Sequence, residues 1–397
     1  MAHSDAAQDS SRENYCCPVC TGTDVETFFS MSEMPVLCNV LYDSPEEARK
    51  APMGDITLGF CETCGHVYNV DFDPQRMVYS DNYENALHFS PRFQAYQENL
   101  AERLVKTYQL SGKNIVEIGC GQGEFLALLC QKGGNRGTGF DPSYRGAEKI
   151  GESVRIFPEY FDETHADLRP DLVVCRHVLE HIDQPIPFMN MLAKTIADVP
   201  DPVIFFEVPN VLFTLRDLSV WDIIYEHVSY FSPDSLRYLF RRHRLEDVQL
   251  TDLYDGQFLG IDARKSATEF DLSDHSPDQL GAFIERFTER FGHKKATWAR
   301  ELKSLSKEGR TAVVWGSGSK GVTFLNLMSQ YPCIEYVVDI NPRKHGKFVA
   351  GTGHPIHPPT RLQEAPPAVI LVMNPIYQDE ITEMVREQGI QAEIMLV

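Results

Sequence analysis

The stretch IYEHVSYFS, residues 224–232, sets two side chains that can hold or move a proton among aromatic residues. Histidine has an ordinary pKa near 6.5, so an imidazole can take up a proton close to neutral pH. His227 is therefore a candidate general base, with Glu226 and Tyr225 as neighbours within reach of a substrate. In an extended segment side chains alternate, and Glu226 would face away from His227. A sharp turn would instead deliver both residues to one site; otherwise one of the two is structural.

Two further histidines compete for the same chemistry in the stretch VVCRHVLEHI, residues 173–182. We expect one of His177 and His181 to contact a cofactor and the other to position a substrate oxygen. A satisfied structural histidine is the alternative reading, for His227 as well as for these two.

A glycine-rich turn has the form E-x-G-x-G-x-G, from Glu117 to Gly123. It follows an expected strand over residues 115–118 and precedes an expected helix from residue 125, and Asp141 ends the next strand. The glycine spacing is tighter than in a dinucleotide fingerprint, which suits a cofactor without a pyrophosphate. Asp141 stands roughly where a carboxylate that binds ribose hydroxyls is expected.

Cysteines form two C-x-x-C pairs, Cys17 with Cys20 and Cys61 with Cys64. Each pair presents two thiolates to one tetrahedral ion, so the four predict a structural zinc site with no open coordination position. Cys16 and Cys38 lie close enough in sequence for an exchange of ligands. Buried thiols without a metal are the alternative.

These residues need a scaffold that brings them together. Apolar strand-like runs alternate with helical stretches after residue 110, which predicts an α/β fold with a parallel, doubly wound sheet. Ligands in such folds bind at the carboxyl ends of the strands. That rule gathers at one edge the following residues: Asp141, His177, Glu180, His181, Glu207 and Asn210. Capping signals predict helices from Ser90-Pro91, Ser232-Pro233 and Ser276-Pro277.

A second strand, turn and helix unit appears near the C-terminus, with the turn GSGSKG over residues 316–321 and Asp339 at the end of a later strand. It predicts a second Rossmann-like α/β domain. Lys320 suits the binding of a substrate diphosphate, while a purely structural domain and dinucleotide binding stay open. The expected organisation is a disordered tail (1–15), a zinc-binding domain (16–80), a cofactor-binding domain (81–265), and a linking helix with the Rossmann-like domain (266–397).

Composition narrows the class of function. The chain has 397 residues, with 57 acidic and 37 basic side chains and a formal charge of −20. This charge disfavours nucleic acid as a partner. There is no apolar run long enough to span a membrane and no signal-peptide pattern at the N-terminus. We therefore expect a cytoplasmic protein, a monomer or homodimer, that acts on a small molecule.

The glycine motif together with Asp141 resembles that of class I S-adenosylmethionine-dependent methyltransferases. The wider arrangement, with paired cysteine knuckles, the EH stretch and the C-terminal glycine-rich unit, is similar to the three-domain sugar C-methyltransferases over essentially the whole chain beyond the tail. The resemblance implies S-adenosylmethionine bound by Glu117, Gly119, Gly121, Asp141 and His177, and structural zinc. It also implies catalytic roles for His227, Glu226, His181 and Tyr225.

The function implied is methylation of a carbon next to a carbonyl in a nucleotide-linked keto-sugar, with His227 as base. The sugar enzymes read Y-x-E-H, whereas Ile224 stands at the tyrosine position here and Tyr225 follows it. The motif could therefore serve another nucleotide-linked or activated carbonyl compound. An O- or N-methyltransferase on the same scaffold is the alternative.

Overall fold

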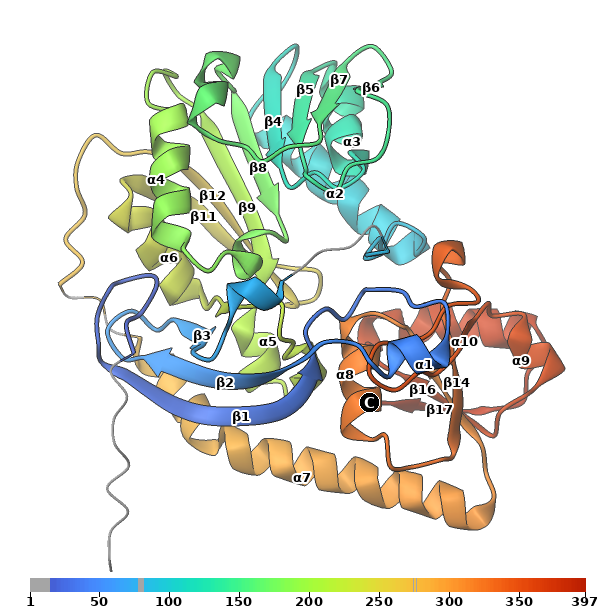
Figure 1. Cartoon of the computed structure of the whole chain (residues 1–397). Helices are drawn as coiled ribbons and strands as arrows, with labels where there is room; N and C mark the ends of the chain where they lie inside the picture. The colour runs from blue at the N-terminus through green and yellow to red at the C-terminus, as the bar shows by residue number, and fades with distance from the viewer. Residues whose placement is uncertain (1–14, 78–81, 274, 276) are drawn as a thin grey trace, which may run out of the picture.

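The computed structural model describes residues 15–77, 82–273, 275 and 277–397, and within them the strands form three sheets (Figure 1). The predicted tail lies outside the described residues except for Tyr15. The same is true of Ser276, the expected N-cap of the long helix. Within the described residues, no helix combines the length and the apolarity needed to cross a membrane.

The first sheet belongs mainly to the N-terminal lobe, residues 15–77, and has the antiparallel order β1-β2-β3-β10. Its strands are β1 (Val25–Pro35), β2 (Met53–Cys61), β3 (Val67–Asn69) and β10 (Ser229–Tyr230). The helix α1 (Pro45–Ala48) and the 3-10 helix η1 (Pro74–Arg76) complete the lobe. Strand β10 comes from the middle of the chain, where Ser229 pairs with Tyr68. The segment that follows His227 is thus hydrogen-bonded to the N-terminal lobe.

The central sheet has eight strands in the order β11-β12-β9-β8-β4-β5-β7-β6. Its members are β4 (Asn114–Ile118), β5 (Arg136–Phe140), β6 (Lys149–Ile150), β7 (Val154–Phe157), β8 (Leu172–Arg176), β9 (Val203–Pro209), β11 (Leu245–Leu253) and β12 (Phe258–Lys265). Strands β9, β8, β4, β5 and β7 run parallel, which confirms the predicted parallel core. The other three are antiparallel, a feature that the sequence analysis did not predict. Strands β11 and β12 are joined by a tight turn, and such a short connection permits only antiparallel pairing.

Helices cover both faces of the central sheet, as expected of a doubly wound fold. They are α2 (Pro91–Thr107), α3 (Glu124–Gly133), α4 (Pro185–Thr195), α5 (Val211–Leu215) and α6 (Pro233–Arg242), with the 3-10 helices η2 (Glu163–Leu168), η3 (Leu179–His181) and η4 (Val220–Asp222). Neighbouring strand residues point to opposite faces: Val173 packs in the core under α4 and α6, and Val174 in the core under α2 and α3. The predicted caps are present, because Ser90 accepts from the Phe93 N–H and Ser232 from the Ser235 N–H.

The third sheet is the C-terminal sheet, with five parallel strands in the order β15-β14-β13-β16-β17. The long helix α7 (Asp278–Glu308) leads into it and packs along β1 (Figure 1). The remaining elements are β13 (Ala312–Trp315), α8 (Ser319–Leu327), β14 (Ile334–Val338), η5 (Pro342–Lys344), β15 (Ile356–His357), α9 (Arg361–Glu364), β16 (Val369–Val372), η6 (Pro375–Tyr377), α10 (Gln378–Glu387) and β17 (Glu393–Leu396).

One hydrophobic core joins the three parts of the molecule. It contains side chains of β1 and β2, of residues 211–225, of α7 and of α8. Residues 220–227, here called the 220–227 loop, therefore lie where the N-terminal lobe, the central sheet and the C-terminal part meet.

Candidate active site

The glycine-rich turn lies between β4 and α3 at the carboxyl end of the central strand. Gly119, Gly121 and Gly123 all have positive φ angles, of 68°, 56° and 84°. The Gly121 N–H donates to Asp141 Oδ2 at 2.8 Å, so the turn and the end of β5 are tied together. The other carboxylate oxygen of Asp141 accepts from the N–H and the hydroxyl of Ser143. The structure thus brings Gly119, Gly121 and Asp141 together, as the sequence predicts.

Glu117 lies on β4 beneath this turn and is 3% exposed. Its Oε2 has no hydrogen-bond partner among the described residues. Burial raises the pKa of Glu117 to about 8, because the charged form loses its water. Glu117 is therefore a largely protonated carboxyl group at neutral pH and can donate a hydrogen bond.

His177 follows β8 directly and has a positive φ of 54°, which few residues other than glycine adopt. Its Nε2 lies 2.7 Å from Glu207 Oε1, and its Nδ1 lies 3.6 Å from Glu180 Oε1. Burial lowers the pKa of His177, but the Glu207 and Glu180 carboxylates outweigh burial and raise it to about 9. His177 is thus an imidazolium at neutral pH that lies beside two carboxylates, although the geometry at its Nε2 is not that of a hydrogen bond.

Glu207 is fully buried and has two further partners, Arg176 and Tyr96. Neither of these two residues was identified from the sequence. Arg176 approaches its carboxylate through Nε at 3.2 Å and Nη2 at 3.3 Å, and the Tyr96 hydroxyl donates at 2.8 Å. Burial alone would raise the pKa of Glu207. The positive charges of Arg176 and His177 outweigh burial and lower the pKa to about 2. Tyr96 lies on α2, far from β9 in sequence, and no local pattern predicts this contact.

The 220–227 loop turns sharply and is not extended. The His227 N–H donates to the Ile224 carbonyl at 3.2 Å, and the Tyr230 hydroxyl bonds both the N–H and the carbonyl of Ile224. Of the two geometries that the sequence leaves open, the structure has the turn. The predicted helix α6 then starts at Pro233.

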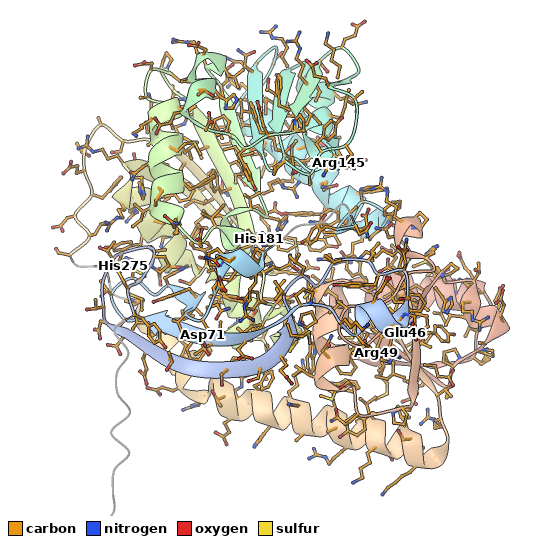
Figure 2. All side chains as sticks on the ribbon, in the orientation of Figure 1. Glu46, Arg49, Asp71, Arg145, His181 and His275 are labelled. Atoms are coloured by element: carbon orange, nitrogen blue, oxygen red, sulfur yellow. The ribbon has the colours of Figure 1, made fainter. Side chains whose placement is uncertain are left out.

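His181 and His227 face each other near the centre of the molecule, where Figure 2 labels His181. Their ring centroids lie 5.0 Å apart. His181 Nδ1 lies 2.8 Å from the Glu226 carbonyl oxygen, which can only accept, so the proton is on Nδ1 and Nε2 carries a lone pair. Each of Glu180, His181 and His227 offers one polar atom, and these atoms lie within 4.8 Å of one another.

His227 is partly buried in this group. Burial lowers its pKa well below the usual value, and the neighbouring His181, His177 and Lys320 lower it further. The ring is therefore neutral at physiological pH. A neutral imidazole at the carboxyl ends of the strands can accept a proton from a bound substrate.

The side chains of Glu226 and Tyr225 make structural contacts. Glu226 is fully buried, with Oε1 accepting from the Cys38 N–H at 3.0 Å and Oε2 from the Tyr83 hydroxyl at 2.6 Å. The Tyr225 hydroxyl accepts from the Asp73 N–H at 2.9 Å. Both side chains therefore anchor the 220–227 loop to Cys38, Asp73 and Tyr83, and their catalytic roles stay predictions.

Four cysteines converge in the N-terminal lobe. Cys17 Sγ lies 3.6 Å from Cys64 Sγ, and Cys20 Sγ lies 3.4 Å from Cys61 Sγ. In a tetrahedral zinc site with Zn–S bonds of about 2.3 Å, sulfur atoms lie roughly 3.8 Å apart, so the set fits the ion. Cys16 is exposed, and Cys38 lies beside Glu226, so neither belongs to the group.

In the second glycine-rich turn, the carboxylate of Asp339 accepts hydrogen bonds from nearby residues of the protein. Asp339 Oδ2 accepts from the N–H of Ser317 at 2.9 Å and from its hydroxyl at 2.5 Å, and Oδ1 accepts from the Asn341 N–H. The expected diphosphate ligand Lys320 pairs instead with Asp222, Nζ to Oδ2 at 2.7 Å. Both side chains thus have protein partners in this structure.

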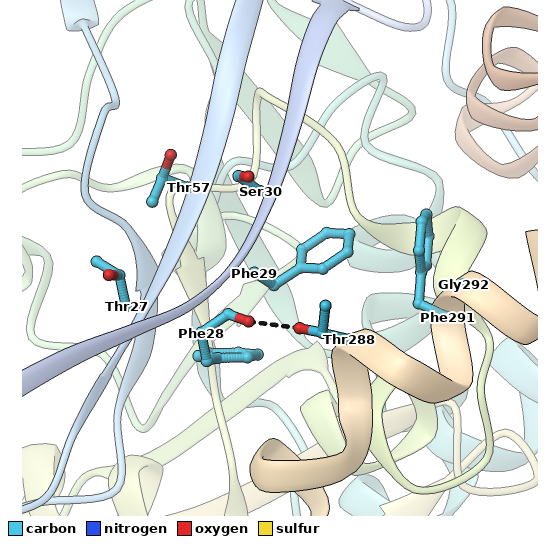
Figure 3. Close-up of a pocket in the computed structure, with 8 residues that line it drawn as sticks. All are labelled: Thr27, Phe28, Phe29, Ser30, Thr57, Thr288, Phe291 and Gly292. Atoms are coloured by element: carbon cyan, nitrogen blue, oxygen red, sulfur yellow. Dashed lines mark hydrogen bonds between the residues drawn. The ribbon is translucent and has the colours of Figure 1, made fainter. Parts of the chain in front are cut away.

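A surface pocket of about 460 Å³ lies elsewhere, between β1, β2 and α7 (Figure 3). Its lining residues carry no titratable side chain; they are Thr27, Phe28, Phe29, Ser30, Thr57, Thr288, Phe291 and Gly292. The Thr288 hydroxyl donates to the Phe28 carbonyl at 2.5 Å across it. None of the predicted site residues lines this pocket.

Comparison with known proteins identifies two regions of the chain. A family profile described as a methyltransferase domain matches residues 89–250, and one described as a C-methyltransferase C-terminal domain matches residues 276–394. The chain is 26% identical over 401 residues to the C-methyltransferase NovU of Streptomyces niveus, covering 94% of this chain and 92% of the relative.

Other similar proteins match the central part alone. A ubiquinone biosynthesis O-methyltransferase of Vibrio cholerae is 26% identical over 193 residues, covering 43% of this chain and 76% of its own. A crystal structure of an S-adenosylmethionine-dependent methyltransferase from Archaeoglobus fulgidus is 20% identical with a TM-score of 0.35, covering 45% of this chain and 98% of that one.

Proposed function

We propose that this S-adenosylmethionine-dependent methyltransferase transfers its methyl group to a carbon next to a carbonyl of a small molecule, with His227 as the base. Use of S-adenosylmethionine follows from the two matched profiles and the relative that spans nearly the whole chain. Carbon as the acceptor is supported by the C-terminal profile and by the printed activity of that relative.

The observation that carries the proposal is the neutral imidazole of His227 in a partly buried group at the carboxyl ends of the strands. A carbon next to a carbonyl becomes nucleophilic only after a proton is removed from it. The lowered pKa keeps the His227 ring neutral near pH 7, so one ring nitrogen has a lone pair that can accept that proton. His181 is held with its Nε2 lone pair free, so it can accept a hydrogen bond from substrate or hold the His227 ring in place.

The cofactor is proposed to lie over the first glycine-rich turn. Asp141 stands at the end of β5, where it can meet ribose hydroxyls, and the positive φ angles of Gly119 and Gly121 let the backbone approach a ligand closely. The Oε2 of Glu117 is an unpartnered buried polar atom beneath the same turn. When bound, S-adenosylmethionine supplies an electrophilic methyl group on a sulfonium.

We propose a nucleotide-linked keto-sugar as the acceptor, on the resemblance of the motifs to sugar C-methyltransferases. The five-stranded parallel sheet supports a Rossmann-like C-terminal domain. We propose that this domain contacts the nucleotide part. Because Lys320 is paired with Asp222, a diphosphate would have to displace that carboxylate or meet other groups. An O- or N-methyltransferase is the alternative. A cytoplasmic location and a monomer or homodimer stay predictions.

We also propose that Cys17, Cys20, Cys61 and Cys64 hold one structural zinc ion. Their sulfur distances fit a tetrahedral site, and four thiolates leave no position open for a substrate. The ion would stabilise the lobe that anchors Glu226 and Tyr225.

Replacing His227 with Asn tests the proposed base. We expect turnover to fall about 10²- to 10⁴-fold, the usual contribution of general-base catalysis, with the dissociation constant of S-adenosylmethionine unchanged. Release of S-adenosylhomocysteine is measured with nucleoside diphosphate keto-deoxyhexoses. His293→Asn, at an exposed position on α7, is the matched control. A loss below about tenfold in His227→Asn would reject His227 as base and favour the O- or N-methyltransferase.

A further inference from the structure

The 220–227 loop is held from the C-terminal side by a ring contact. Trp221 in the loop packs edge-to-face against Phe324 of α8, with centroids 5.0 Å apart and the planes at 88°. Both side chains are buried in the core that joins the three parts of the molecule. The helix that follows the second glycine-rich turn therefore contacts the loop that ends at His227.

An ion pair adds a polar contact beside the ring pair. Lys320 in the first turn of α8 and Asp222 in η4 lie 2.7 Å apart, with 10% and 21% of their side chains exposed. A lysine in the first turn of a helix is disfavoured by the helix dipole, and the Asp222 carboxylate offsets this. In a site this shielded, loss of one partner leaves the other charge unpaired.

We infer that Lys320 is a positioning residue for His227: by holding Asp222 it fixes the loop from which His227 enters the active site. The inference rests on the proposed role of His227 as base. The chain from Asp222 to His227 is short, and the Tyr230 hydroxyl and the His227 N–H hold the intervening Ile224. Movement at Asp222 would thus pass directly to the imidazole.

Lys320 also contributes charge to the site. The groups that act on His227 are His181 and His177 from the end of β8 and η3, with Glu180 between them, and Lys320 from α8 with its partner Asp222. The ammonium group of Lys320 lowers the pKa of His227. Removing this positive charge would let the pKa of His227 rise.

Three variants of the full chain test the inference. Lys320→Met removes the charge, Lys320→Arg keeps it, and Lys303→Met at an exposed position on α7 is the control. In Lys320→Met we expect faster hydrogen exchange of the amides of residues 223–228 and a fall in kcat of at least about tenfold. The acid limb of the kcat profile should move to higher pH, because a cation near the base is lost. Lys320→Arg should recover most of kcat, and the dissociation constant of S-adenosylmethionine should stay unchanged.

Hydrogen exchange needs no substrate, so it separates the two proposals. Faster exchange in Lys320→Met together with normal turnover in His227→Asn would retain the positioning contact and reject the base. Wild-type exchange of residues 223–228 in Lys320→Met would overturn the inference, whatever the activity of His227→Asn. Asp222→Asn, which keeps the side-chain shape, should give the same hydrogen-exchange reading if Lys320→Met does not fold; the acid limb should not move to higher pH in this variant, because the Lys320 cation remains.

Discussion

His177 and His227 lie in one site, yet their neighbours give them opposite protonation states. The carboxylates of Glu207 and Glu180 keep His177 charged, whereas burial, with a smaller contribution from the cations of His177 and Lys320, keeps His227 neutral. Opposite shifts within one site are a usual sign of divided roles. His227 has the state of a base, and His177 has the state of a fixed cation that holds two carboxylates in place.

Because His177 is charged in the folded protein, we expect the free energy of unfolding to depend on pH. Its pKa is raised in the folded state to about 9, above about 6.5 in the unfolded chain. The stabilising contribution is therefore complete below pH 6.5 and is lost as pH rises through 9, by up to about 3 kcal/mol. Urea unfolding at pH 6, 7.5 and 9.5 measures it.

His177→Gln provides the comparison for that experiment. In this variant the decline between pH 6.5 and 9 should be smaller than in the wild type. An equal decline in both proteins would place the titrating group elsewhere.

At the scale of elements, the strand, turn and helix from β4 to α3 form the most predictable part of the site. Gly119 must be a glycine for two reasons. Its φ of 68° is left-handed, and a Cβ there would lie 2.2 Å from Val178 Cγ2. Val178 belongs to the chain segment between His177 and η3, so a shift there would disturb both sides of the site.

Gly119→Ala should therefore weaken S-adenosylmethionine binding by at least about tenfold and lower the melting temperature. Gly112→Ala is the matched control, because Gly112 has a φ of 65° and a methyl group added there would meet no atom within 4 Å. That control carries only the left-handed strain, about 1–2 kcal/mol. Titration calorimetry compares the two, and equal affinities in both variants would contradict the role of the close contact.

Local sequence patterns predicted the helices and the parallel strands. They could not predict contacts between residues that lie far apart in the sequence. The caps at Ser90 and Ser232 and the parallel core follow from sequence patterns and are confirmed. The antiparallel strands β11 and β12 were not predicted, and the turn before His227 was one of two geometries that the sequence left open. Glu226 is a candidate catalytic residue in the sequence, but the Cys38 N–H that donates to its carboxylate lies 188 residues away. No spacing rule reports such a contact.

At the scale of the whole molecule, the 220–227 loop is held by all three parts. The N-terminal lobe binds Tyr225 through Asp73, the central part binds the Glu226 carbonyl through His181, and the C-terminal part binds Asp222 through Lys320. Activity should therefore depend on parts of the chain that do not contact the methyl group.

Loss of zinc tests that dependence. We expect about one zinc ion per chain in the isolated protein, and Cys61→Ser should lose it, melt at lower temperature and lose turnover, because the lobe that anchors Tyr225 and Glu226 loosens. Cys16→Ser, at the exposed neighbouring cysteine, should keep the ion and the activity. Elemental analysis and thermal melting measure both. Full activity in metal-free protein would contradict the proposed structural role.

The position of the transferred methyl group tests the central claim most directly. The enzyme is supplied with S-adenosylmethionine carrying a ¹³C-labelled methyl group and with nucleoside diphosphate keto-deoxyhexoses, and the product is examined by carbon–proton correlation NMR. Proton removal by His227 predicts a labelled methyl group bonded to the carbon next to the carbonyl. A label bonded to oxygen or nitrogen would contradict it.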